Sequence, residues 1–443
     1  MATKRKTTTT RRASSASTNG ARPASRSNIQ RPASNLKPAV PPRGVTLIPN
    51  GTATSPKGFV AGAVYAGIKT LGADPLDLGV LASDRPATVA AMFTRSSVKG
   101  AAVIQSQFNA RRGTARGVVV NAGISNVGTG APGLRDAAEM CRLAADLIGA
   151  TPGSMLVGST GVIGKPLPID KIRAGIPRIQ LSPKGGALFA RAIVTTDTHP
   201  KTMAVRVGGA RGYTIGAVAK GSGMIHPDMA TMFCFLTTDA AVERRFLQNA
   251  LHEAVDASLN MLSVDADTST SDTTAIFANG AASGAVIAHD SPAAGQFQSA
   301  LRYITTEMAK MLARDGEGAR KLIEVRIEGA GSLKEARAAA RTVTASPLVK
   351  TAVHGNDPNW GRLLMAVGRS YVRISLDRAR AWIGRVPVYD RGPLAFDERA
   401  AAAELRREHV VLRVDLGISD ASATAWGCDM TADYVHINAD YTT

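Results

Sequence analysis

The sequence has few cysteines, few aromatic residues and no long apolar run. Its three cysteines, Cys141, Cys234 and Cys428, lie far apart, and so small and odd a set favours a reduced cytoplasmic protein over a disulfide framework. Because it has no CxxC or HExxH motif and its histidines are scattered, we expect no protein-bound metal. No apolar run approaches the roughly 20 residues of a membrane-spanning helix, and none near the N-terminus resembles a secretory signal.

Acidic residues are absent from residues 1–43, which hold ten lysines and arginines, more than half of the net charge of +18. This stretch is rich in Thr, Ser, Ala and Pro, a composition that predicts a disordered basic tail. Such a tail can be a transit peptide, a non-specific binder of nucleic acid, or a solvated appendage. It has no aromatic residue for base stacking, and its prolines oppose a targeting helix. We therefore favour the appendage, and expect neither specific nucleic-acid binding nor membrane binding.

The rest of the chain predicts a mixed α/β protein. Hydrophobic residues make up 44% of the sequence and charged residues 20%, as in globular proteins of two or three domains. Apolar residues at helical spacing predict helices over residues 134–148, 242–262 and 293–313. Short apolar runs predict strands at 116–123, 154–164, 323–327, 372–376 and 410–416, and on each side of residues 220–233. Strands mixed with helices throughout indicate an α/β or α+β fold.

Three further segments read as β structure. Residues 90–107, AAMFTRSSVKGAAVIQSQ, predict a strand, a turn and a second strand. Residues 192–201, AIVTTDTHPK, form a β-rich run that Pro200 closes. The terminal YVHINADYTT is expected to end the chain on a strand.

The segment KGSGMIHPDMATMF, residues 220–233, carries the first candidate for chemistry, Thr231. A threonine hydroxyl inside a chain has no base of its own, but cleavage before Thr231 would create an α-amine with a pKa of about 7.7–8.0. A positioned amine of that kind can accept the hydroxyl proton at neutral pH. Gly221 and Gly223 permit a strained loop that would favour acyl transfer from Ala230 to the hydroxyl. By itself the Ala-Thr pair is weak support, since most such pairs are inert.

Other segments add candidates that remain ambiguous alone. The Ser-Thr-Gly turn at residues 159–161 can present a hydroxyl and a backbone N–H as an oxyanion hole, or can be an ordinary turn. In DGEGARK, residues 315–321, Glu317 can bind an amino group, or the segment can be a helix end with solvated charges. TAVHGNDPNWGR, residues 351–362, reads as a dense turn in which Trp360 is a structural anchor at least as well as a ligand contact.

Taken in order, these segments resemble the ornithine acetyltransferase family, the bifunctional glutamate N-acetyltransferases of arginine biosynthesis. The resemblance covers everything from about Gly44 to Thr443. The motifs that carry it are GFVAGAVYAGIK, STGVIG, TTDTHPK, KGSGMIHPDMATM, DGEGARK, TAVHGNDPNWGR and YVHINADYTT.

The resemblance implies a fold, a reaction and a set of site residues. It implies an αββα-like sandwich of the self-processing aminopeptidase type, with a second smaller α/β domain. It implies cleavage between Ala230 and Thr231 into an α chain, residues 44–230, and a β chain, residues 231–443, which assemble as an (αβ)₂ heterotetramer. Thr231 would then carry acetyl from N-acetyl-L-ornithine to L-glutamate. The residues that match the family's functional positions are Thr160 and Gly161 for the oxyanion hole, and Thr195 (or Thr196), Lys220, Thr231, Glu317, Asn438 and Thr443 for substrate.

The resemblance implies no cofactor, and leaves open whether acetyl-CoA serves as a second acetyl donor, as it does in some members. The sequence departs from the family where NAGISNVGTG, residues 121–130, replaces NSGNANACTG, and where DADTSTSD, residues 265–272, replaces DGDTSTND. Ser96 and Ser97 stand where the family often has asparagine. These departures make the reaction type safer than the identity of the substrate. Two alternatives stay open, an N-terminal-threonine amidohydrolase or aminopeptidase acting on small N-acyl amino acids, and a nucleic-acid-binding protein that uses the basic tail.

Overall fold

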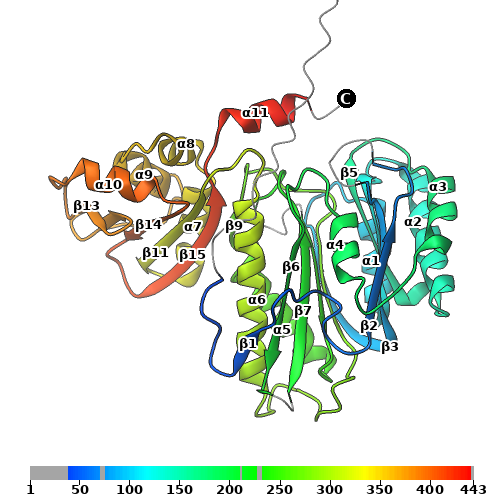
Figure 1. The fold of residues 1–443 in the computed structure, drawn as a ribbon. Helices are drawn as coiled ribbons and strands as arrows, with labels where there is room; N and C mark the ends of the chain where they lie inside the picture. Colours follow the sequence, from blue (N-terminus) through cyan, green and yellow to red (C-terminus); the bar gives the residue numbers. More distant parts are fainter. Residues whose placement is uncertain (1–37, 70–74, 210–211, 227–231, 441–443) are drawn as a thin grey trace, which may run out of the picture. The chain divides into compact units, whose positions relative to one another are not determined.

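A computed structural model of the chain describes residues 38–69, 75–209, 212–226 and 232–440. Figure 1 shows a large sheet with helices around it and a smaller sheet beside it. The large sheet has nine strands in the order β1-β6-β7-β8-β10-β3-β4-β5, and β2 pairs with β3. Their bounds are β1 Val45–Leu47, β2 Phe59–Val64, β3 Leu78–Phe93, β4 Thr114–Ile124, β5 Met155–Val162, β6 Lys201–Val207, β7 Tyr213–Lys220, β8 Phe233–Thr238 and β10 Thr273–Ala278.

The large sheet folds back on itself through the long strand β3. The first part of β3 pairs with β2 and β4, and its last part pairs with β10. Between the two halves lies an apolar core that joins Leu81, Val118 and Leu156 to Phe235 and Phe277. Side chains alternate across a strand, so the opposite face of each half is free to receive helices.

Two groups of helices cover those outer faces. Helices α5 (Arg244–Asp256) and α6 (Ala294–Arg314) share a core with β6, β7 and β8. On the other half, α1 (Ala101–Ala110), α2 (Gly130–Leu147) and α3 (Ile169–Gly175) share a core with β3, β4 and β5. The short helix α4 (Gly186–Ala192) contributes Phe189 to the central core. The order helix, sheet, sheet, helix confirms the predicted sandwich.

The smaller sheet has the strand order β13-β12-β14-β11-β15-β9. Its strands are β9 Leu262–Ser263, β11 Leu322–Ala330, β12 Arg380–Ile383, β13 Val386–Asp390, β14 His409–Asp415 and β15 Ala421–Cys428. The helices around it are α7 Leu333–Thr344, α8 Pro347–Gly355, α9 Trp360–Gly368 and α10 Glu398–Leu405, and α11 (Ala432–Ala439) follows the last strand. This sheet is the predicted second α/β element.

Most of the predicted elements are present, and the first exception has a physical reason in its contacts. Residues 101–107, predicted as a strand, belong to α1, which buries Ala102, Ser106 and Asn109 at helical spacing. Asn109 Nδ2 donates to the carbonyl of Met155 at 2.7 Å, and Ser106 Oγ donates to the carbonyl of Val157 at 2.7 Å. Docking on β5 therefore selects a helix for a run that is too short to be assigned from its pattern.

Three other predicted strands are wrong. Residues 372–376 form no strand, and residues 192–200 lie in the end of α4 and the loop that leads into β6. The described part of the chain end is the helix α11. The strand at residues 154–164 does not end at the Ser-Thr-Gly triplet, because β5 pairs with β4 through Thr160, Gly161 and Val162.

The turn at residues 356–359 is confirmed as a structural feature. Asn356 caps α8 with φ of 56°, and Asn359 caps α9. Trp360 packs against Tyr389 with ring centroids 5.4 Å apart. This contact agrees with the prediction that Trp360 is a structural anchor.

Candidate active site

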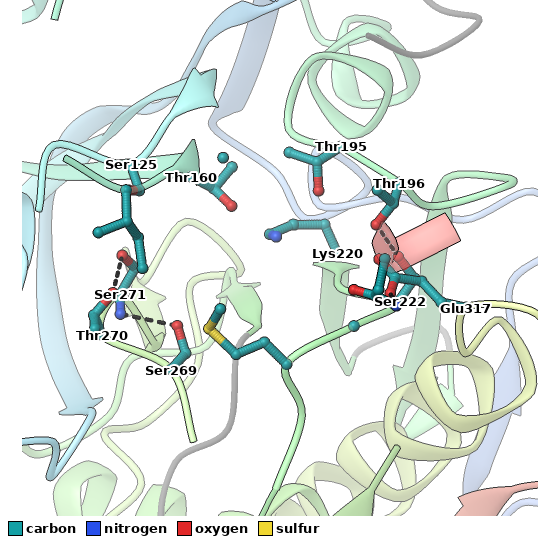
Figure 2. A pocket seen from close by; sticks show the side chains of 15 residues that line it. Ser125, Thr160, Thr195, Thr196, Lys220, Ser222, Ser269, Thr270, Ser271 and Glu317 are labelled. Atoms are coloured by element: carbon teal, nitrogen blue, oxygen red, sulfur yellow. Dashed lines mark hydrogen bonds between the residues drawn. The ribbon is translucent and has the colours of Figure 1, made fainter. Parts of the chain in front are cut away.

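A cavity of about 120 Å³ opens where strand β5, strand β7 and the loop after α6 come together. Six of the residues that the sequence singled out line it: Thr160, Gly161, Thr195, Lys220, Glu317 and Asn438. Thr196, the alternative to Thr195, lines it as well, and Figure 2 shows the hydroxyls of both threonines near Lys220. Residues far apart in the sequence therefore share one site.

Thr160 and Gly161 lie within β5, just before its last residue Val162, and pair with β4. Gly161 has φ of +126°, and a Cβ at this position would lie 2.2 Å from the carbonyl carbon of Gly123. Gly161 is paired with Gly123 on the neighbouring strand, and only glycine fits so close an approach with a positive φ. Thr160 is buried, and its hydroxyl faces the cavity in Figure 2. The arrangement is suited to presenting a hydroxyl and a backbone group to one point.

Lys220 ends strand β7 and is 3% exposed. Its Nζ lies 5.6 Å from the centroid of the Phe233 ring. Burial lowers the pKa of the Lys220 ammonium, and the neighbouring Asp197 and Asp272 carboxyls oppose that shift only in part. A lysine with so little hydration is available to a carboxylate that enters the cavity.

Glu317 is held at the cavity by backbone and side-chain contacts. Its N–H donates to the carbonyl of Ser222 at 2.8 Å, and its Oε2 accepts from Asn438 Nδ2 at 2.8 Å. A Cβ on Gly223 would lie 2.4 Å from the same Oε2, so the carboxylate rests directly on this glycine. The segment does begin at a helix end, because Asp315 caps α6, but Asp315 and Glu317 are buried, so the prediction of solvated carboxylates is wrong.

The threonine segment after α4 is tied to the loop that follows Lys220. Thr196 Oγ1 and Ser222 Oγ lie 2.6 Å apart. Asp197 accepts from the Gly221 N–H at 2.7 Å and from the Thr195 N–H at 3.2 Å. One carboxylate thus orients both segments of the site.

Asp197 also belongs to a buried ion network that the sequence did not reveal. Lys201 Nζ lies 2.6 Å from Asp197 Oδ1 and 2.5 Å from Asp315 Oδ2. Asp315 also accepts from the Thr198 N–H at 3.1 Å and from the Thr198 hydroxyl. Burial opposes ionisation of Asp197, but Lys201 and Lys220 outweigh it and hold its pKa below the ordinary value. The three residues stand in TTDTHPK and DGEGARK, but charge alone gave no sign that they pair.

Ala230, Thr231 and Thr443 lie outside the described residues. The described residues next to the predicted cleavage point are firmly held. Asp265 accepts from the N–H groups of Met224 and Ile225 at 2.6 and 2.9 Å. Asp272 Oδ1 accepts from the Met232 N–H at 2.8 Å, and burial raises the pKa of this carboxyl well above its ordinary value. Ala266 and Ser271, where DADTSTSD departs from the family, therefore stand next to the two aspartates that bind the backbone at residues 224–225 and at Met232.

Residues 60–443 match the ArgJ family. The chain belongs to the ArgJ family. The arginine biosynthesis bifunctional protein ArgJ of Dehalococcoides mccartyi is 47% identical over 402 residues, which cover 90% of this chain and 99% of that protein. The protein of the same name from Symbiobacterium thermophilum is 50% identical over 398 residues, covering 89% of this chain and 99% of its own length.

Two crystal structures with related sequences are also similar to parts of the chain. ArgJ of Bacillus halodurans is 39% identical, with a TM-score of 0.46, over 47% of this chain and 98% of that chain. An ornithine acetyltransferase of Mycobacterium tuberculosis, in complex with ornithine, is 34% identical, with a TM-score of 0.39, over 41% and 98% respectively.

Membership of the ArgJ family confirms the resemblance that the motifs carried. The protein is an acetyl-transferring enzyme of arginine biosynthesis, and the amidohydrolase alternative is not favoured. In the part of the chain that the structure covers, no helix is long and apolar enough to cross a bilayer. The same residues contain no cluster of three or more His, Cys, Asp or Glu that could hold a metal ion.

Proposed function

We propose that this ArgJ family member cleaves itself between Ala230 and Thr231 and then carries acetyl from N-acetyl-L-ornithine to L-glutamate as an ester on Thr231. The observation that supports this proposal is the convergence of Thr160, Gly161, Lys220, Glu317 and Asn438 on one small cavity. The motif match supplies the role of Thr231, and the cavity supplies a place for the substrate.

The reaction divides into two transfers of the same acetyl group. The Thr231 hydroxyl attacks the acetyl carbonyl and passes its proton to the new α-amine, which gives it to the departing nitrogen as the carbon–nitrogen bond breaks and ornithine is released. The amine of glutamate then attacks the ester, and N-acetylglutamate leaves as the Thr231 hydroxyl re-forms. The Thr160 hydroxyl and the Gly161 N–H are our candidates for stabilising the oxyanion in both transfers.

Substrate binding follows from the charges of the cavity. Both substrates carry an α-carboxylate, for which Lys220 is the cation. Glu317, oriented by Asn438 and Gly223, is suited to an amino group. Thr195 or Thr196 and Thr443 complete the set of proposed substrate contacts. Because donor and acceptor share the same α-amino acid frame, one cavity serves both halves of a ping-pong reaction.

Several further properties rest on the family resemblance. They are an α chain of residues 44–230, a β chain of residues 231–443, an (αβ)₂ assembly and a cytoplasmic location. We propose that the enzyme needs no resident cofactor. Assay of N-acetylglutamate formed from acetyl-CoA and glutamate tests whether acetyl-CoA is a second donor.

Intact-mass measurement of the purified protein tests the proposal directly. We expect two chains, one ending at Ala230 and one beginning at Thr231. Brief exposure to N-acetylornithine without glutamate should add one acetyl group, about 42 Da, to the β chain alone. Active protein that consists of one intact chain would overturn the proposal, and so would an adduct on the α chain.

A further inference from the structure

The proposed reaction sets an electrostatic problem at the far end of the substrate. Ornithine and glutamate share the α-amino acid frame, but one side chain ends in an ammonium group and the other in a carboxylate. A fixed charge facing that end would attract one substrate and repel the other, and an opposed like charge costs several kcal/mol. A cavity that serves both substrates therefore has to be uncharged where the side chains end.

The charged groups of the cavity are confined to one part of it. Among its described lining residues, Lys220 and Glu317 are the charged ones. Figure 2 shows Glu317 with Thr195, Thr196 and Ser222 on one side, and Lys220 near the middle. On the other side the view shows Ser125, Ser269, Thr270 and Ser271. We call these four residues the hydroxyl wall.

The hydroxyl wall is held in place by bonds to its surroundings. Ser125 Oγ donates to the carbonyl of Val162 at 2.8 Å. The carbonyl of Ser269 accepts from Thr94 Oγ1 at 2.6 Å, and the carbonyl of Thr270 accepts from the Gly100 N–H at 2.9 Å. Ser269 and Ser271 are buried and line the cavity. The wall is therefore a fixed surface that does not have to be ordered when substrate binds.

The hydroxyls of Thr270 and Ser271 are also suited to both kinds of charge, whereas those of Ser125 and Ser269 are already bonded within the fold. A hydroxyl can donate one hydrogen bond or accept two, and its proton rotates to suit the partner. Thr270 Oγ1 and Ser271 Oγ lie 3.4 Å apart, near enough to act on one group. The same oxygens can accept from an ammonium group and donate to a carboxylate, with no net charge to favour either.

We propose that the hydroxyl wall is the subsite for the substrate side chain, and that its lack of charge lets one cavity take both the ornithine donor and the glutamate acceptor. This inference rests on the proposed function and adds to it the residues that set side-chain tolerance. Ser271 and Thr270 are the specificity-determining positions. Lys220, near the middle, and Glu317, on the opposite side, hold the α-amino acid frame.

The test places a charge on the wall and measures each substrate separately. In a ping-pong reaction, kcat/KM for N-acetylornithine and kcat/KM for glutamate are independent of the partner's concentration. We expect Ser271→Asp to lower kcat/KM for glutamate about tenfold or more relative to N-acetylornithine, and Ser271→Lys to shift the ratio the opposite way. Ser271→Ala should change both substrates alike. Ser299→Asp, on the exposed face of α6, is the matched control and should leave the ratio unchanged.

A second pair of variants guards against misfolding. If either Ser271 variant fails to fold, judged by circular dichroism, the half-buried Thr270 carries the same test as Thr270→Asp and Thr270→Lys. Charges of opposite sign that move both substrates in the same direction would overturn the subsite. A different result would overturn the proposed function itself, namely that the unmodified protein transfers no acetyl group to glutamate.

Discussion

Lys201 and Asp315 form an ion pair that is closed to solvent, with Nζ 2.5 Å from Oδ2 and side-chain exposures of 0% and 3%. The pair joins the start of β6 to the loop that carries Glu317 two residues later. Asp197 completes the network and accepts from the N–H of Gly221, next to Lys220. A buried network thus connects the two charged residues of the cavity through the fold beneath them.

Lys201→Met should be strongly destabilising. It leaves Asp197 and Asp315 as buried carboxylates without their cation, and removal of one partner from a buried pair costs about 3–5 kcal/mol. Urea unfolding measures this loss. Arg142→Met is the control, because Arg142 and Asp146 form an exposed pair, and should cost about 1 kcal/mol or less. A loss of stability no greater than that of the control would show that the network is not structural.

Gly223→Ala should impair substrate binding more than folding. A Cβ on residue 223 would lie 2.4 Å from Glu317 Oε2, so the carboxylate must move away. We expect KM to rise about tenfold, which corresponds to about 1.4 kcal/mol of lost binding. Gly295→Ala makes the same change where no other atom lies within 4 Å, and should leave KM unchanged. Equal KM values for the two variants would contradict the placement of Glu317 against this glycine.

Thr231→Ala tests the nucleophile. Without the hydroxyl we expect a single intact chain of about 46.1 kDa and no acetyl transfer, observed by mass spectrometry and by assay of N-acetylglutamate. Thr231→Ser keeps a hydroxyl and should retain both cleavage and transfer. Transfer at the unmodified rate by Thr231→Ala would remove Thr231 from the mechanism.

Lys220 should give binding an alkaline limit. Burial lowers the pKa of its ammonium, so the positive charge is lost at a lower pH than the ordinary value of about 10.4. We expect KM for glutamate to rise as the pH increases through that lowered pKa. Lys220→Arg keeps its charge throughout this range and should abolish the alkaline rise, although its own KM at neutral pH will differ. An identical alkaline rise in both proteins would assign the limit to another group.

Glu324 should contribute to stability down to acid pH. Burial alone would raise its pKa, but His409 and Arg326 outweigh burial and lower it to about 2. A pKa depressed in the folded state gives stability that is complete above the unfolded value of about 4.3 and is lost as the pH falls toward 2. Glu324→Gln should therefore flatten the acid limb of the free energy of unfolding between about pH 4.5 and 2, measured by urea titration. An unaltered acid limb would show that other carboxyls account for it.

The sequence predicted best where periodicity was strong. The helices α2, α5 and α6 carry apolar stripes at helical spacing over many residues, and the strands β11 and β14 are short apolar runs. It failed at α1 and α11, where a run of eight to ten residues is compatible with either helix or strand. Contacts with β5 decide the first case, and such contacts are not visible in local pattern.

The sequence alone determined the family and the reaction class and predicted the site residues, because these depend on motifs that are short and continuous. Only the tertiary structure decided which motifs meet. The folding of the large sheet through β3 and the position of the loop after α6 bring Thr160, Lys220 and Glu317 to one cavity. It also decided that Asp197, Lys201 and Asp315 are paired and that Ser269, Thr270 and Ser271 line the same cavity. Burial and pairing are long-range properties, so charge and hydroxyl content in the sequence could not distinguish these residues from a solvated surface.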